Sequence, residues 1–176
     1  MLKLYRTNNR VKEYWEAWAT PSEITIHWGK LGEDGQTREL SATPGIDPNE
    51  TIERESKPFR AAGFKALKRT ERHSVVIQYQ IPGQGSSSDL DKRIKVEELM
   101  NDRLGWTGLG HCDGGDIGSG SMNIFCYVVD IVIAESVIVR ELTSNGLLDG
   151  AVIVEQVEGN TRVFWPHDFK GKFSVI

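Results

Sequence analysis

Residues 26–40 read I-H-W-G-K-L-G-E-D-G-Q-T-R-E-L and carry the clearest structural signal in the chain. Between residues 23 and 28, apolar and polar side chains alternate with Trp28 on the apolar face, which is the pattern of a half-buried strand. Residues 33–36 contain an Asp-Gly pair, which is typical of a tight β-hairpin turn. The stretch therefore predicts an antiparallel hairpin that returns along residues 36–42, and its first strand ends in Trp-Gly-Lys.

The flanking residues extend this hairpin into a small sheet with one helix. Residues 12–18, K-E-Y-W-E-A-W, have the aromatic content of a strand. Residues 41–50 have the composition of a loop. Residues 59–72 predict a helix, because Pro58 suits a first helical turn and apolar residues recur along one side. The opposite side of that helix would be basic, with Arg60, Lys65, Lys68, Arg69 and Arg72.

This arrangement resembles the WGR domain, a family named for its Trp-Gly-Arg signature. The resemblance rests on the His27–Lys30 strand, on the glycine-rich turn that ends at Gln36, and on the helix that closes the unit. It covers roughly residues 1–75. Lys30 stands where the family has Arg, and His73-Ser74 stands near the place of its usual Gly-Tyr. The resemblance implies an antiparallel sheet with one helix.

The resemblance also implies an interaction function. In poly(ADP-ribose) polymerases, domains of this family contact DNA near a strand break and relay that contact to a catalytic domain, and no such catalytic domain fits within these 176 residues. The side chains suit the role, because an indole can stack on a base and an ammonium can meet a phosphate. The alternative is that Trp28 belongs to the core. The expected nucleic-acid-binding residues are Trp28, Gly29, Lys30, Arg38, Lys65, Lys68 and Arg69.

Charge is distributed unevenly between the two halves of the chain. Residues 1–72 contain 13 Lys and Arg against 11 Asp and Glu, whereas residues 73–176 contain 8 against 14. A polyanionic partner should therefore prefer the first half. The acidic second half would suit a basic protein partner, as an immunity or antitoxin protein would need.

The second half predicts the element order β-α-β-β-α-β. Two split βαβ units on one antiparallel sheet, the ferredoxin-like arrangement, satisfy this order best. The chain is therefore expected to be α+β, with a WGR-like domain over residues 1–72 and a ferredoxin-like domain over residues 73–176. The expected strands are 73–81, 108–117, 122–130, 151–157 and 162–165. The expected helix 89–104 would have Leu90, Ile94, Leu99, Met100 and Leu104 available for burial. The expected helix 131–142 would be amphipathic, with Ala134, Val137, Ile138 and Leu142 on its apolar face.

A glycine-rich hairpin, which includes His111–Asp116, has no assigned role. His111 and Cys112 point to opposite faces of a strand, which argues against a metal site. If the hairpin turns near Ser119, Cys112 and Cys126 face each other across the strands, and we expect both to be reduced thiols.

No nucleophile, base and orienting group can be assembled from the sequence, so we expect neither enzymatic activity nor a cofactor. No apolar run is long enough for a membrane span and no secretory signal is recognised, so a cytoplasmic location is the default expectation. The favoured function is a non-enzymatic bacterial interaction protein that binds nucleic acid, with DNA ends as the suggested target. The alternative is a protein-binding module that uses the acidic half.

Overall fold

The computed structural model describes residues 1–158, 160–171, 173 and 174. The chain divides into two compact units, and each is described by itself. The first unit comprises Met1–Arg69 and Trp106–Gly108, and the second comprises Thr70–Gly105 and Leu109–Ile176. Both units combine helices with antiparallel strands, so the protein is α+β, as the sequence predicts.

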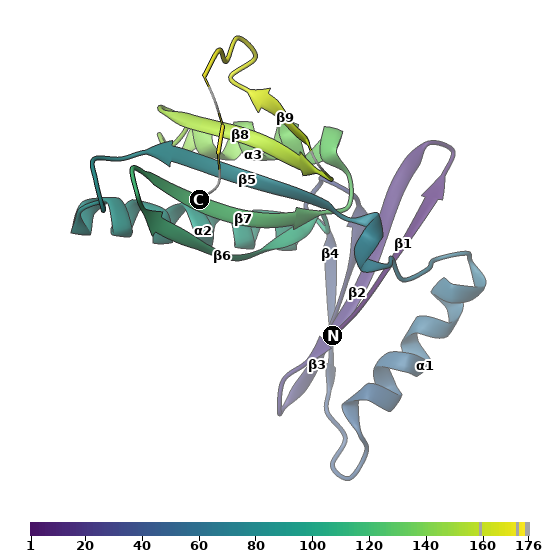
Figure 1. Ribbon diagram of the computed structural model, residues 1–176. Coiled ribbons are helices and arrows are strands. Elements are labelled where there is room, and N and C mark those ends of the chain that lie inside the picture. The colour runs from purple at the N-terminus through teal and green to yellow at the C-terminus, as the bar shows by residue number, and fades with distance from the viewer. Residues whose placement is uncertain (159, 172, 175–176) are drawn as a thin grey trace. The chain divides into compact units, whose positions relative to one another are not determined.

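The first unit is built on a four-stranded antiparallel sheet in the order β1-β2-β3-β4 (Figure 1). The hairpin predicted from the Trp-Gly-Lys stretch is confirmed as β3-β4, in which Trp28 pairs with Gln36. β1 was not expected from the sequence. It pairs with β2 along its length, with Leu4 opposite Trp15. The strands are β1 (Leu2–Asn8), β2 (Val11–Ala19), β3 (Glu23–Lys30) and β4 (Gln36–Ser41).

The helix of the first unit is α1 (Pro48–Ala61), which begins earlier than predicted. Asp47 caps its N-terminus, because the Asp47 carboxylate accepts a hydrogen bond from the Asn49 amide at 2.9 Å. Pro48 occupies the first turn, where a missing N–H costs nothing. Pro58, which was expected to start the helix, lies inside it.

The prediction of a helix over residues 59–72 is therefore wrong beyond its first few residues. α1 ends before Gly63, which has a φ of +93° that other residues rarely adopt. Lys65 then forms an isolated antiparallel bridge with Tyr5 of β1. A short 3-10 helix, η1 (Arg69–Glu71), precedes the second unit's first strand.

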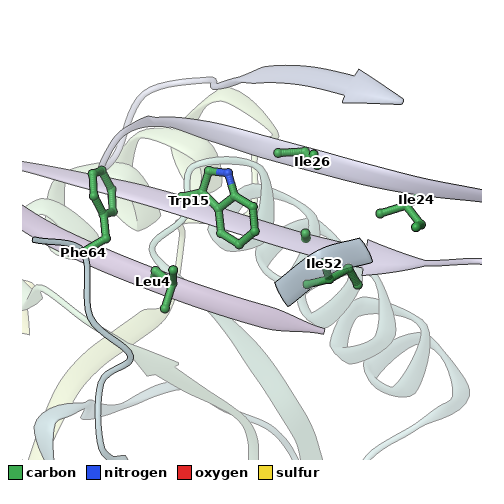
Figure 2. Packing of buried hydrophobic residues seen from close by; sticks show 7 residues of the cluster. Leu4, Trp15, Ile24, Ile26, Ile52 and Phe64 are labelled. Carbon is green, nitrogen blue, oxygen red and sulfur yellow. The ribbon is translucent and has the colours of Figure 1, made fainter. Parts of the chain in front are cut away.

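The core of the first unit lies between α1 and one face of the sheet. Figure 2 shows its labelled side chains gathered over the strands. Trp15 is fully enclosed, and its ring lies 5.2 Å from that of Phe59 on α1, measured between centroids. Burying such large rings is the main stabilising contribution available to a unit of this size. The buried members are Leu4, Trp15, Ala17, Ile24, Ile26, Ile52 and Phe64.

The other face of this sheet is contacted by residues 106–108, a segment far away in sequence. The Trp106 ring meets His27 edge-on at 5.0 Å between centroids, and it meets Trp18 at 6.4 Å. The Thr107 carbonyl accepts a hydrogen bond from the Gly32 amide at 2.9 Å. This segment therefore belongs structurally to the first unit, which sequence periodicity did not indicate.

The second unit contains a five-stranded antiparallel sheet in the order β6-β7-β5-β8-β9. β6 and β9 form its edges, and β5 lies at its centre between β7 and β8. The predicted strand at residues 151–157 is confirmed with those bounds. The strands are β5 (His73–Gln80), β6 (Gly110–Gly118), β7 (Ser121–Val128), β8 (Ala151–Val157) and β9 (Asn160–Trp165).

Two helices, α2 (Ser87–Trp106) and α3 (Ile131–Ser144), accompany this sheet (Figure 1). Lys92 of α2 lies over the ring of Tyr79 at 3.9 Å, which shows the face of β5 that α2 covers. The burial predicted for α3 is confirmed at Ala134, Val137, Ile138 and Leu142. On α2, Leu90 and Ile94 were expected to be available for burial but are exposed, and the buried residues are Val96, Met100 and Leu104.

Among the described residues, no helix combines the length and the apolar character that crossing a membrane would require.

The position of α1 can be tested at its cap. Asp47→Ala removes the acceptor for the Asn49 amide and should lower the free energy of unfolding by about 1 kcal/mol, as measured by urea denaturation. Asp47→Ser retains a capping oxygen and should recover most of that loss. No effect of Asp47→Ala would contradict a helix that begins at Pro48.

Candidate functional site

Trp28, Gly29 and Lys30, the last three residues of β3, line the wall of a pocket in the first unit. Trp28 is half-buried rather than fully exposed, because it shares a face with Ile24 and Ile26 and packs against the core cluster. Lys30 is exposed, with 61% of its side chain accessible. The end of β3 therefore presents one partly accessible indole and one accessible ammonium to the same pocket.

The pocket has a volume of about 500 Å³, within the roughly 300–1,000 Å³ range of small-ligand sites. Residues from β1, β2, β3, the β3-β4 turn and α1 contribute to it. Its aromatic and apolar lining consists of Tyr14, Trp28, Pro58, Phe59, Ala62 and Phe64. Its polar and glycine lining consists of Arg6, Glu13, Gly29, Lys30, Glu33, Asp34, Gly35 and Gln36.

The charges around the pocket are mixed. Arg6 is already engaged, because its Nε donates to Glu13 Oε2 at 2.8 Å and its guanidinium lies 4.6 Å from the centroid of Phe64. Lys30 Nζ lies 3.7 Å from Glu33 Oε1, and both side chains are more than half exposed, so this pair restrains Lys30 only weakly. Three carboxylates and two cations line the pocket, which therefore has no excess of positive charge.

The structure does not gather all of the predicted nucleic-acid-binding residues. Trp28, Gly29 and Lys30 lie together at the pocket. Arg38 lies on β4 and pairs with Glu55 of α1 at 2.6 Å. Lys65 lies beside β1, which is the opposite edge of the sheet from β4. Lys68 and Arg69, expected on a helix, follow α1 as exposed residues.

A buried polar relay was missed in the sequence. Glu16 Oε1 lies 2.8 Å from His27 Nδ1, and His27 Nε2 lies 2.8 Å from the Tyr14 hydroxyl. Lys3 Nζ lies 2.6 Å from the other Glu16 oxygen, and the Tyr14 hydroxyl donates to the Trp106 carbonyl at 3.3 Å. Strand alternation places Tyr14, Glu16 and His27 on one face, but only the β2-β3 register shows that they touch.

The surroundings of the relay shift the pKa values of Glu16 and Tyr14. Burial raises the pKa of Glu16, but the hydrogen bond from His27 and the charge of Lys3 outweigh it, so the pKa lies below its ordinary value of 4.5. Burial, reinforced by the charge of Glu16, raises the pKa of Tyr14 far above 10, and Tyr14 stays protonated. Glu16 and His27 are only 3% and 1% exposed, so they stabilise the sheet and are not accessible for binding a ligand.

The glycines of the turn make room for Tyr14. A Cβ on Gly35 would lie 2.1 Å from the Tyr14 hydroxyl oxygen and 2.4 Å from His27 Nε2. A Cβ on Gly29 would lie 3.0 Å from the Gly35 Cα. This packing explains why the largest side chain of β3 is followed at once by the smallest, since Trp28 and Gly29 face opposite sides of the sheet.

The glycine-rich hairpin of the second unit places Asp116 within a polar chain of side chains. Asn123 donates to Asp116 at 2.6 Å, and Gln78 donates to Asn123 at 2.8 Å. His111 lies against the ring of Tyr127, with centroids 5.8 Å apart. Across residues 1–158, 160–171, 173 and 174, no group of three or more His, Cys, Asp or Glu side chains is arranged to hold a metal ion.

Comparison with known proteins finds no match for this chain among protein-family models, curated proteins or solved structures.

The packing around Tyr14 predicts the effect of adding one methyl group. Gly35→Ala should destabilise the first unit by about 3 kcal/mol or more, because backbone and side-chain atoms on three sides would have to shift. Gly105→Ala is the matched control, since its Cβ meets nothing within 4 Å. As a helix substitution it should be neutral or stabilising by up to about 1 kcal/mol. Equal stability of the two variants in urea denaturation would refute this account of the turn.

The relay predicts acid sensitivity. A lowered pKa in the folded state means that ionised Glu16 contributes stability above pH 4.5, and that this stability is lost as the pH falls through the folded pKa. Glu16→Gln should therefore cost about 3 kcal/mol at neutral pH and flatten the dependence of unfolding free energy on pH below 4.5. Glu39→Gln on exposed β4 should stay within about 0.5 kcal/mol and keep the wild-type pH profile. An unchanged profile in Glu16→Gln would show that the relay does not control acid stability.

Proposed function

We propose that the first unit is a non-enzymatic recognition module that binds the end of a nucleic acid in the pocket beside Trp28. The observation that carries this proposal is that Trp28, Gly29 and Lys30 line one pocket of about 500 Å³. The resemblance of the His27–Lys30 stretch and the following glycine-rich turn to the WGR signature supports it. The second unit's strand order, β6-β7-β5-β8 with two helices, is the one that a ferredoxin-like fold requires, and we propose that fold for it.

A terminal base or sugar is the group that the pocket suits best. Trp28 and Phe59 offer aromatic surface, and stacking of a base on such a ring contributes about 1–3 kcal/mol. A terminal nucleotide can enter a pocket by giving up its pairing and its stacking on one neighbour, whereas an internal nucleotide would lose its stacking on two neighbours. Lys30 is accessible at the same pocket and can meet the adjoining phosphate.

The mixed charge of the pocket limits the extent of the contact. Glu13, Glu33 and Asp34 would repel a phosphate backbone that crossed the pocket. Only one or two phosphates should therefore be neutralised, and log Kd should change with log salt concentration with a slope of about 1 to 2. This is weaker than the salt dependence of proteins that track a duplex.

A protein partner is the second candidate, because carboxylates outnumber cations in the same pocket and Arg6 is engaged internally. A Lys or Arg side chain from a partner could enter the aromatic pocket and approach Glu33. The acidic second half of the chain, with 14 Asp and Glu against 8 Lys and Arg, favours the same class of basic partner.

Binding to DNA with and without ends tests the proposal. A labelled blunt-ended duplex should bind, and a covalently closed circle of the same sequence should bind at least about 10-fold more weakly. Trp28→Leu keeps an apolar side chain against the core but removes the ring, so it should weaken end binding by about 10-fold or more. Lys30→Ala should weaken binding and reduce the salt slope by about 1.

Lys95→Ala provides the charge-matched control, because Lys95 is exposed on α2 of the second unit. It should leave end binding unchanged. Glu33→Gln separates the two candidates, since it should tighten DNA-end binding and weaken binding of a lysine-rich peptide. Equal affinity for duplex and circle, or an unaltered affinity in Trp28→Leu, would reject the nucleic-acid proposal.

A further inference from the structure

The two cysteines of the chain lie directly opposite each other on neighbouring strands of the second unit. Cys112 is on the edge strand β6, and Cys126 is on β7. Cys126 also pairs with Val75 of β5, so it lies on the same sheet face as Ile77 and Tyr79. Both thiols therefore project from that face, which α2 covers at Tyr79.

The backbone geometry at this position suits a covalent bond between the sulfurs. The Cys112 amide donates to the side chain of Asn101 at 3.2 Å, so it is not used in a hydrogen bond to β7. Cys112 and Cys126 are thus a non-hydrogen-bonded pair, the type with the shorter Cα separation of about 4.5 Å and the closer side chains. Disulfides span Cα separations of about 4.4–6.8 Å, so no large backbone movement is needed.

The two sulfurs differ in access. Cys112 lies on the edge strand β6 and is partly exposed, whereas Cys126 is 0% exposed. The Cys112 thiol is within hydrogen-bonding reach of Cys126, and this contact together with burial raises the pKa of Cys126. Cys112 is therefore the sulfur that an external reagent meets first, and Cys126 is the resolving thiol behind it.

We propose that Cys112 and Cys126 form a reversible modification site for low-molecular-weight disulfides of the glutathione-disulfide class. Cys112 loses its proton and its sulfur attacks one sulfur of the small disulfide; the small S–S bond breaks and releases one small thiol. Cys126 then loses its proton and attacks the Cys112 sulfur, which releases the second small thiol. The protein pair is oxidised to a disulfide, and one small disulfide is reduced to two thiols.

The product would fix the edge of the sheet. The β6-β7 register shifts between Cys112 and Gly115, so β6 is irregular immediately after the cysteine. A bond from Cys112 to Cys126 closes the hairpin loop on itself and holds this edge strand against β7. The constraint acts mainly on the unfolded chain, so it should stabilise the second unit.

Equilibration of the whole folded protein in glutathione buffers tests the proposal. With rising glutathione disulfide, the intact mass should fall by two hydrogen atoms, and both thiols should become unreactive to a thiol reagent. Peptide mapping should then recover one cross-link between Cys112 and Cys126. The same equilibration in strong urea should require a more oxidising buffer, because the native strands hold the sulfurs together. The oxidised protein should melt at a higher temperature, by about 5 °C or more.

Two variants identify the role of each sulfur. Cys126→Ala should stop at a stable mixed disulfide between Cys112 and glutathione, and its melting temperature should not rise on oxidation. Cys112→Ser should remain unmodified while folded, because the remaining thiol is buried. Persistent glutathione on Cys112 in the wild-type protein, a disulfide between two chains, or no advantage of the folded over the urea-unfolded state would overturn the proposal.

Discussion

The first unit depends on the space that its backbone leaves for Tyr14. Three glycines approach this side chain: Gly29 on β3, Gly35 in the β3-β4 turn and, far away in sequence, Gly108 after α2. A Cβ on Gly108 would lie 2.3 Å from the ring. His27 holds the hydroxyl from the side. A single tyrosine therefore fixes the turn of one hairpin and the docking of a remote segment at the same time, because close packing leaves no room for alternatives.

The sequence predicts those parts of the fold that are determined locally. The β3-β4 hairpin follows from strand alternation and the Asp-Gly pair, and the buried face of α3 follows from helical periodicity. The sequence does not predict the start of α1, because Asp47-Pro48 has the composition of a loop, although these two residues form a cap and a first turn. β1 was missed because its sequence, L-K-L-Y-R-T-N, is a strand mainly through its pairing with β2.

The residue types of the candidate site can be predicted from the sequence, but the pocket that surrounds them cannot. The Trp28–Lys30 stretch can be identified from residue types alone. Its pocket cannot, because Arg6, Phe59 and Phe64 reach it from distant segments, and they determine both its aromatic surface and its charge. The relay through Glu16 and His27 cannot be predicted without the strand register. Alternation along a strand shows which sheet face a side chain occupies, but it does not show which residue of the next strand lies beside it. The basic surface predicted for a helix over residues 59–72 does not form, because α1 spans Pro48–Ala61 and most of those basic residues lie beyond its end.

The return of Trp106–Gly108 to the first unit bears on how such a protein can evolve. Domain boundaries usually fall in linkers that few contacts cross, so one continuous stretch of sequence then holds the residues that the fold needs. Here the Trp106 ring packs against His27, and the Trp106 carbonyl accepts a hydrogen bond from the Tyr14 hydroxyl. In the sequence, however, Trp106 follows the first strand and most of a helix of the second unit. A gene fragment that ended near Arg69 would encode a sheet with one bare face. A rearrangement that separated the two coding regions would therefore remove packing and a hydrogen bond from the first unit.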